Sequence, residues 1–353
     1  MTEGLLVTAE AGWLGGSSLR RPVAVLVRDG HISWAGPPSE APAGVERVRA
    51  DGVLLPGLVD HHVHTGLIDI AALLRHGLTT VRDLGWIPAE ILPRARASAA
   101  AGFDGPRILA AGPFLTAPGG YPTDRSWAPS GVAWELNSPE EAREAVNVLA
   151  AHRPETVKVA MNAEAGPVLD DPTLASVVTA AHELRLGVTA HTEGPGQAAR
   201  AWYAGVDQLA HTPWSEELDD RLVARLASTT SIVSTVDIHG WGEDTPQRRR
   251  AVANLRRFHR CGGRILYGTD LGNGPLPEGI NQREITALQQ AGLSPPEILR
   301  SMSMQALTRG ARADLVAVPT DPLVDPRRLV EAAPVLKAGA PPGEQKSTGR
   351  EGQ

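Results

Sequence analysis

The middle of the chain alternates short apolar runs with longer amphipathic segments. Eight apolar runs have the length and composition of buried strands, at residues 53–60, 79–82, 107–110, 156–159, 187–190, 207–210, 231–236 and 264–267. Helical patterns separate most of them, and at 172–185 the apolar stripe consists of Leu174, Val177, Val178, Ala181 and Leu184. Eight strand–helix repeats predict an α/β protein, specifically a (β/α)8 TIM barrel over residues 53–310.

Both ends of the chain depart from this alternation. Residues 1–52 contain short β signals, and Asp29-Gly30 between two of them is typical of a tight hairpin. A similar run follows at 313–318. We therefore predict one small sheet module, built from residues 1–52 and 311–337, beside the barrel. Residues 338–353 are mostly Gly, Pro and polar, and we predict a disordered tail there.

Composition and charge exclude several classes of partner. The chain has 353 residues, of which 42% are hydrophobic and 21% charged, as in ordinary globular proteins. A formal net charge of −6 gives no reason to expect nucleic acid or an anionic membrane as a partner. No apolar run reaches the roughly 18 residues of a membrane span, and the first residues lack the features of a signal peptide. We expect a cytoplasmic protein with a small-molecule substrate, and leave open whether it forms a homo-oligomer.

The clearest chemical signal lies at the end of the first predicted barrel strand. The apolar run changes polarity abruptly at Asp60, and His62 and His64 follow, two residues apart. On a strand, residues i and i+2 point to the same face, so the two imidazoles converge on one point, as a metal ion requires. A His-x-His pair alone is weak evidence, because surface histidines also pair by chance.

Further candidate ligands lie at the ends of other predicted strands, where the chemistry of this barrel type is located. Lys158 is on the fourth run, His191 ends the fifth, His211 ends the sixth and Asp270 follows the eighth. Four histidines and a carboxylate at one end of a barrel suit zinc-like divalent ions. The alternative for Asp270 is a structural carboxylate that caps the next loop.

Lys158 stands between Val157 and Val159 on a predicted barrel strand. An unpaired buried ammonium is costly, so we expect burial to lower its pKa and leave a neutral amine. A neutral amine can add CO₂ to become a carbamate, whose two oxygens can bridge two metals. The alternative is an ammonium that pairs with Asp270 or Glu164.

Taken together, the motifs resemble the amidohydrolase superfamily. They are the stretch Pro56-Gly57-Leu58-Val59-Asp60-His61-His62-Val63-His64, the strand lysine, the two later histidines and Gly268-Thr269-Asp270. The stretch 79–85 and the pair Gly119-Gly120 resemble its imidazolonepropionase and prolidase-like branch. The resemblance covers about residues 1–337. It implies that the small module is a β-sandwich formed by both chain ends.

The resemblance also implies the ligand set of the binuclear members that carry a carbamylated lysine. His62, His64 and Asp270 would hold one metal ion, and His191 and His211 would hold the second. Carbamylated Lys158 would bridge the two ions together with a hydroxide. The implied cofactors are therefore two divalent metal ions, expected to be zinc, and a CO₂-derived carbamate.

Two features differ from the pattern of that family. Residues 304–307 run almost directly into 312–315, where relatives carry a longer connection with another sandwich strand, so we expect a reduced module. Tyr121 follows Gly119-Gly120 at a position where a histidine is frequent in this branch. A relative's substrate therefore does not transfer directly to this chain.

The expected reaction is hydrolysis of an amide (C–N) bond in a cyclic amide or in a dipeptide-like or N-acyl substrate. The metal-bridging hydroxide would attack the carbonyl, and Asp270 would carry its proton to the leaving nitrogen. The same binuclear site would serve a lactone or another ester, and fold alone does not decide the substrate. A non-catalytic scaffold is the remaining interpretation, and intact ligands at all six positions argue against it.

Tryptophan is unusually common, with 8 residues against 3 Phe and 3 Tyr. The loops expected at the barrel mouth carry Trp86, Trp127, Trp134, Trp214 and Trp241. An aromatic wall would favour an apolar or ring-containing substrate, whereas the alternative is that these indoles pack loops onto helices. Arg82 and Arg125 are candidates for binding a substrate carboxylate. The candidate substrate-binding residues are Tyr121, Glu193, His239, Asn273, Trp86 and Trp241.

Overall fold

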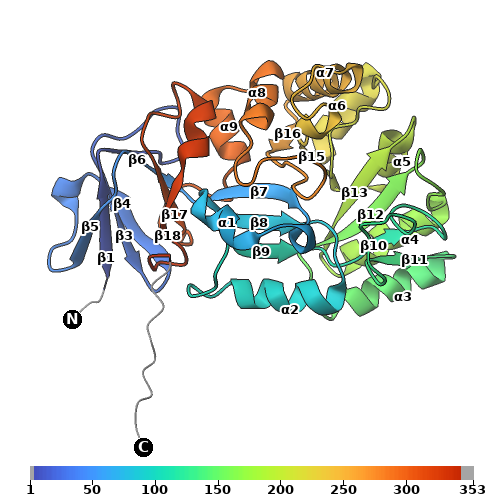
Figure 1. Ribbon diagram of the computed structural model, residues 1–353, viewed down its shortest axis with the longest axis horizontal. Coiled ribbons are helices and arrows are strands. Elements are labelled where there is room, and N and C mark those ends of the chain that lie inside the picture. The colour runs from blue at the N-terminus through green and yellow to red at the C-terminus, as the bar shows by residue number, and fades with distance from the viewer. Residues whose placement is uncertain (1–3, 343–353) are drawn as a thin grey trace, which may run out of the picture.

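The computed structural model describes residues 4–342, so most of the predicted tail lies outside the described residues. Two four-stranded sheets form a small β module at the left of Figure 1. One sheet has the order β4-β3-β1-β5, with bounds His31–Gly36, Val23–Arg28, Leu5–Ala9 and Glu46–Arg49. The other has the order β18-β17-β6-β2, with bounds Ala333–Leu336, Leu315–Val318, Val53–Pro56 and Ala11–Gly12. Val25 of the first sheet and Leu54 and Leu315 of the second belong to one apolar cluster, so the sheets share a core.

The run at 53–60, predicted as a single strand, is two strands that belong to different sheets. β6 pairs with β17 in the small module, whereas β7 (Leu58–Val63) pairs with β8 (Leu78–Asp83) in the larger part. Gly57 separates them, and a Cβ at this position would lie 2.0 Å from Thr79 Oγ1. The apolar pattern is continuous because both strands are buried, so it does not reveal the break.

Ten parallel strands make up the larger part of the molecule. Three of them form the sheet β7-β8-β9, in which β9 spans Arg107–Ala110. The other seven have the order β11-β10-β12-β13-β14-β15-β16, with bounds Ala133–Glu135, Phe114–Thr116, Thr156–Asn162, Gly187–Glu193, Gln208–Leu209, Ser231–Val233 and Arg264–Leu266. Backbone hydrogen bonds connect the two sheets on both sides, from Glu155 N to Ala110 O (2.8 Å) and from His61 N to Tyr267 O (3.0 Å). The α/β architecture is therefore TIM-barrel-like, and the short strands β10 and β11 are additions that the sequence pattern did not predict.

Nine α-helices lie outside these strands in the described chain, and Figure 1 shows α2 and α3 on one side and α6 to α9 on the other. Their bounds are α1 Ile70–Arg75, α2 Pro88–Ser98, α3 Pro139–Ala150, α4 Asp171–Glu183, α5 Gln197–Ala204, α6 Asp220–Thr229, α7 Pro246–Arg260, α8 Gln282–Gln290 and α9 Pro295–Ser301. Short 3₁₀ turns occur at η1 (Pro38–Glu40), η2 (Thr65–Leu67), η3 (Asp237–His239) and η4 (Pro326–Glu331). Ser138 caps α3 and a capping box starts α9 at Ser294, while α4 is capped by Asp170.

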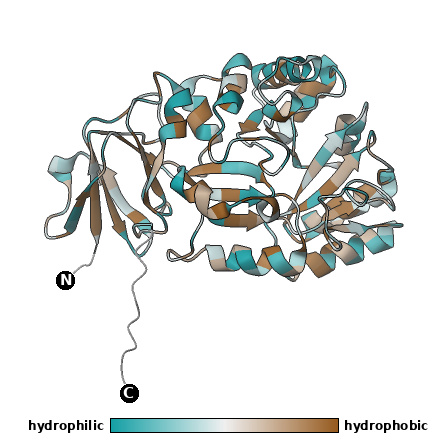
Figure 2. Ribbon diagram, in the orientation of Figure 1, coloured by the Kyte–Doolittle hydropathy of each residue, from teal (hydrophilic) through white to brown (hydrophobic). Residues whose placement is uncertain are grey.

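Apolar residues concentrate on the inner strands, as the brown colouring of Figure 2 shows, while the outer helices alternate between polar and apolar faces. No helix in residues 4–342 combines the length and apolarity of a membrane span. In the described chain, the segment between α9 and β17 is short and forms no strand of its own. It makes isolated β-bridges, such as the one between Leu58 and Ser303.

Residues 338–342, the described part of the predicted tail, directly follow Lys337, which is held by hydrogen bonds to other parts of the protein. Lys337 is buried and its Nζ donates to Phe103 O at 2.9 Å, and its backbone N–H donates to Ala340 O at 2.8 Å. The first residues after β18 are thus held against the larger part of the molecule.

Candidate metal centre

Six side chains from five strand ends meet at the carboxyl ends of the parallel strands. β7 contributes His62, and His64 follows it directly, while β12 contributes Lys158. The other three are His191 in β13, His211 after β14 and Asp270 after β16. All six are buried. The strand order brings together residues more than 200 positions apart, such as His62 and Asp270.

His62 and His64 converge on the carboxylate of Asp270. The Nε2 atoms of both rings lie 3.1 Å from Asp270 Oδ1, but neither contact has the direction of a hydrogen bond. The Nδ1 atoms are already engaged, at 2.9 Å from Ala210 O for His62 and 3.2 Å from Gly85 O for His64. Because a carbonyl only accepts, Nδ1 carries a proton in both rings and Nε2 faces the centre. Burial lowers the pKa of His62 well below its usual value, whereas for His64 the effect of burial is outweighed by Asp270, which raises its pKa.

His191 and His211 form the opposite side of the centre. His191 Nδ1 and His211 Nε2 lie 2.9 Å apart, so one nitrogen of each ring faces the same space. The remaining nitrogens are fixed by neighbours, His191 Nε2 by Glu193 Oε2 at 3.0 Å and His211 Nδ1 by Thr235 Oγ1 at 2.9 Å. Burial lowers the pKa of His211 well below its usual value and so favours the neutral imidazole that binds metals.

Lys158 forms no hydrogen bond or ion pair in the described chain, although the carboxylates of Asp270 and Asp83 act on its charge from a greater distance. Its side chain is fully buried, its Nζ makes no hydrogen bond, and no carboxylate, including those of Asp270 and Glu164, lies within ion-pair distance. Burial lowers the pKa of Lys158 from 10.5 to about 7. The nearest aromatic ring is that of Phe114, whose centroid lies 5.7 Å from Nζ. A large share of the amine is therefore neutral near pH 7, which is the form that CO₂ addition needs.

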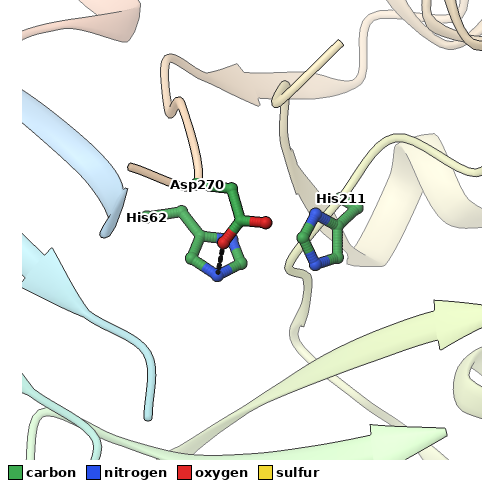
Figure 3. Close-up of side chains that lie close together, drawn as sticks. All are labelled: His62, His211 and Asp270. Carbon is green, nitrogen blue, oxygen red and sulfur yellow. Dashed lines mark ion pairs between the residues drawn. The ribbon is translucent and has the colours of Figure 1, made fainter. Parts of the chain in front are cut away.

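The unpaired polar atoms at the centre are consistent with the binding of metal ions. His62 Nε2, Lys158 Nζ and Asp270 Oδ1 are all buried without a hydrogen-bond partner, which is costly unless another species satisfies them. Ligand atoms of His62, His211 and Asp270 lie within 4.8 Å of one another, and Figure 3 shows these side chains facing a common space. Imidazole and carboxylate donors at this spacing are the ligands of zinc-like ions.

Two further carboxylates, whose role the sequence analysis did not assign, hold the backbone around these ligands. Asp60 accepts from the backbone N–H of His62 (2.9 Å) and from the hydroxyl of Thr269 (2.6 Å). Asp83 accepts from the N–H and hydroxyl of Thr65 at 2.8 and 2.7 Å. Asp60 lies within the stretch 56–64 and Asp83 within the motif 79–85, and this position is the signal that could have identified them. Such outer partners fix the orientation of metal ligands.

Three of the seven described non-glycine residues with positive φ lie at the centre or at the cavities beside it. Asp270, Thr235 and Trp241 are non-glycine residues with φ values of 59°, 41° and 45°. Each residue in this left-handed region costs on the order of 1–3 kcal/mol unless its surroundings hold it there. Asn273 supports Asp270 by donating Nδ2 to its Oδ2 at 2.8 Å. The strain places the carboxylate where the histidines converge.

Two cavities open onto the centre and meet at Tyr121, Asp270 and Asn273, which line both. The outer cavity has a volume of about 410 Å³ and is lined by further residues that include Asn162, His191, Glu193, His211, Trp214, His239, Trp241, Glu243 and Gln247. The inner cavity has a volume of about 390 Å³ and includes His64, Leu67 and Trp127. Together they have the size of a small-molecule site.

Most of the predicted substrate-binding residues line these cavities. Tyr121 stacks on His191 with ring centroids 5.1 Å apart. Glu193, His239 and Trp241 line the outer cavity, and Asn273 lines both. The sequence analysis missed Asn162, whose Nδ2 donates to Glu193 Oε2 at 2.5 Å; its place at the end of the strand that carries Lys158 was the available signal.

Trp86 lies elsewhere. Its indole packs over Gly66 and donates to Glu90 Oε2 at 2.9 Å, and it lines neither cavity. Trp134 likewise packs against the core, whereas Trp127 and Trp214 join Trp241 at the cavities. Gly66 has no side chain, so the indole can lie against the backbone there instead of turning toward the centre. Position in a loop at the barrel mouth did not determine the direction of the indole.

The two arginines considered for a substrate carboxylate are engaged with the protein. Arg82 donates to Gln208 Oε1 at 2.9 Å and to Glu155 Oε1 at 3.2 Å. Arg125 pairs with Asp124 at 2.9 Å and lies with Cζ 5.9 Å from the ring centroid of Tyr121. Neither arginine lines the outer or the inner cavity.

Comparisons with known proteins agree with the geometry. Residues 53–352 match the model of the amidohydrolase family. An uncharacterised protein of Mycobacterium tuberculosis (strain ATCC 25618 / H37Rv) is 27% identical, with 90% of this chain and 91% of that protein covered. The imidazolonepropionase of Deinococcus deserti is 25% identical over 94% of this chain and 95% of its own. The crystal structure of a putative prolidase from Bifidobacterium longum superposes with a TM-score of 0.80 at 25% identity, covering 97% of this chain and 95% of that one. The chain belongs to the amidohydrolase family, in its imidazolonepropionase and prolidase-like branch, and is a hydrolase that acts on carbon–nitrogen bonds.

Proposed function

We propose that this protein is a binuclear metal hydrolase that cleaves an amide bond in a cyclic amide or in a dipeptide-like or N-acyl substrate. The observation that carries the proposal is the convergence of six buried donor side chains in which His62 Nε2, Lys158 Nζ and Asp270 Oδ1 have no partner. The proposal includes the architecture, which we infer to be a (β/α)8 barrel with a β-sandwich module formed by both chain ends.

The ligands divide into two groups around Lys158. His62, His64 and Asp270 would hold one divalent ion, and His191 Nδ1 and His211 Nε2 would hold the other. Lys158, as a carbamate, would add anionic oxygen ligands between the two groups. Bound there, ions such as zinc supply Lewis acidity and make a water molecule acidic enough to act as a nucleophile at neutral pH.

Asp270 is the residue we assign to proton transfer. Its Oδ1 faces the centre, while Asn273 holds Oδ2 in place at 2.8 Å. A carboxylate at this position can accept a proton from the attacking water and donate it to the leaving nitrogen. That transfer is needed because an amide nitrogen leaves poorly unless it is protonated.

Side chains of the cavities orient the substrate. His239 Nε2 is buried without a partner, and this ring lines the outer cavity, so it is available to a substrate carbonyl or amide. Burial raises the pKa of Tyr121, which keeps its hydroxyl protonated as a hydrogen-bond donor between the two cavities. The aromatic surfaces of Trp127, Trp214 and Trp241 favour a substrate with an apolar or ring-containing part.

Elemental analysis combined with a substrate panel tests the proposal. The purified protein should contain two divalent metal ions per chain at saturation, and it should hydrolyse members of a panel of cyclic amides, dipeptides and N-acyl amides. Asp270→Asn provides the matched inactive variant, because it retains an oxygen ligand but cannot carry the proton. One metal or none at saturation would exclude the binuclear centre. Turnover confined to lactones in the same panel would replace the amide by an ester bond.

A further inference from the structure

The outer cavity combines aromatic surfaces with carboxylates. Three aromatic side chains, those of Tyr121, Trp214 and Trp241, line it together with Glu193 and Glu243. Neither this cavity nor the inner one has a lysine or arginine among the described residues that line it. Away from the metal ligands, the charge of the outer cavity is therefore negative.

Histidine does not change this balance. His239 is the one histidine of the outer cavity, in the described chain, that we have not assigned to a metal, and burial lowers its pKa to about 4. It is neutral near pH 7, and its ring lies 5.1 Å from that of Trp214. It can exchange a hydrogen bond with a ligand but cannot neutralise a carboxylate.

The carboxylates are available to a ligand to different degrees. Glu193 uses Oε2 for His191 Nε2 at 3.0 Å and for Asn162 Nδ2 at 2.5 Å, which leaves Oε1 without a recorded partner. Glu243 is exposed at the rim, and its carboxylate forms no hydrogen bond or ion pair with another described residue. Trp241, two residues earlier, is 46% exposed at the same rim.

We propose that the outer cavity binds a cationic amine, so that the natural substrate is an amide whose outer arm ends in an ammonium group and not in a free carboxylate. The substrate class rests on the proposed amide hydrolysis, whereas the amine site itself does not. Indole faces attract cations through their quadrupole, and the rim carboxylate adds an ion pair. A carboxylate in the same place would meet negative side chains and no lysine or arginine in the described lining, since Arg125 lies over the Tyr121 ring with its Cζ 5.9 Å from the ring centroid and pairs with Asp124.

Binding of three matched probes tests the site directly. The probes are 4-phenylbutylamine, 4-phenylbutanamide and 4-phenylbutanoate, which share a phenylalkyl body and differ in the charge of the end group. Their dissociation constants are measured by calorimetry on the metal-loaded protein near pH 7. The neutral amide is the reference, because a carboxylate can also bind the metals. We expect the amine to bind about fivefold or more tightly than the amide, the range of an ion pair combined with a cation–π contact.

Variants at the rim connect this preference to a residue. Glu243→Gln should reduce the preference for the amine over the amide about threefold, and Glu243→Lys should abolish it or reverse it in favour of the carboxylate. Glu278→Gln is the matched control, because Glu278 is exposed on the loop after β16 and lines neither cavity. Glu193 is left unchanged because it contacts a proposed metal ligand.

The outcomes separate this inference from the proposed function. An amine that binds no more tightly than the amide, or a preference that Glu243→Gln and Glu278→Gln change equally, overturns the amine site. Hydrolysis of only carboxylate-bearing dipeptides from a matched series overturns the substrate class and leaves the metal hydrolase intact. An amine preference that depends on Glu243 in a protein that hydrolyses no amide supports the amine site and rejects the proposed reaction.

Discussion

Replacing Lys158 by methionine should stabilise the metal-free protein while removing its activity. The lysine side chain is fully buried, its Nζ has no hydrogen-bond partner, and burial lowers its pKa from 10.5 to about 7. Methionine is an unbranched side chain of similar length that adapts to irregular space and carries no charge. The substitution therefore removes a desolvated amine without a large cavity.

The magnitude follows from the difference in pKa between the folded and unfolded chains. Between about pH 7 and pH 10.5 the unfolded state binds more protons at Lys158, so the wild-type protein gains stability as pH rises through this window. The cost of the buried amine is about 4 kcal/mol near pH 7 and falls to about 1 kcal/mol near pH 9.5. Lys158→Met should raise the unfolding free energy by about these amounts, or the melting temperature by about 5 °C near pH 7.

Calorimetric and guanidinium chloride unfolding measure this difference at both pH values. EDTA and CO₂-depleted buffer keep metal and carbamate off Lys158, and guanidinium is preferred because cyanate in urea modifies amines. Lys337→Met is the control, since burial also lowers the pKa of Lys337, to about 8, but its Nζ donates to Phe103 O at 2.9 Å. Its removal leaves a carbonyl unpaired, and this cost of about 1–3 kcal/mol offsets the relief of the buried amine, so Lys337→Met should gain less stability than Lys158→Met. Equal changes in the two variants, or a gain in Lys158→Met that does not shrink with pH, would refute the reasoning.

Three other outcomes are expected from the site geometry. Lys158→Ala should lose activity, and short carboxylic acids should partly restore it by supplying bridging oxygens; full activity without them would refute the bridging role. Asp270→Asn should keep the fold and at least one metal by elemental analysis but lose about 10²–10⁴-fold in kcat, and a loss below about tenfold would mean that another residue moves the proton. Trp241→Ala should raise KM about tenfold with unchanged metal content. Trp86→Ala removes an indole outside both cavities, so it should lower stability and leave KM unaltered. Equal KM values in the two variants would contradict the assignment of Trp241 to the substrate cavity.

The candidate metal ligands could be proposed from the sequence because each belongs to a local pattern. An apolar run followed by a polar residue marks the end of a buried strand, and parallel strands bring their carboxyl ends together. His62, His191 and His211 follow such runs, and Lys158 is conspicuous as a cation within one. The spacing of apolar residues and the change in polarity are local properties of the chain, so they can be recognised without knowledge of the fold.

The tertiary structure decided what depends on distant neighbours. Gly57 divides one apolar run between two sheets because Thr79 and Asp314 crowd the position where a Cβ would stand. Trp86 turns away from the cavities because Gly66 offers its backbone as a packing surface, although its loop position resembles that of Trp214. The absence of a cationic side chain from the described lining of the cavities also emerges only when loops from five or more strand ends are assembled. Side-chain direction and cavity charge are set by packing between segments far apart in the chain, and a linear pattern carries no information about such contacts.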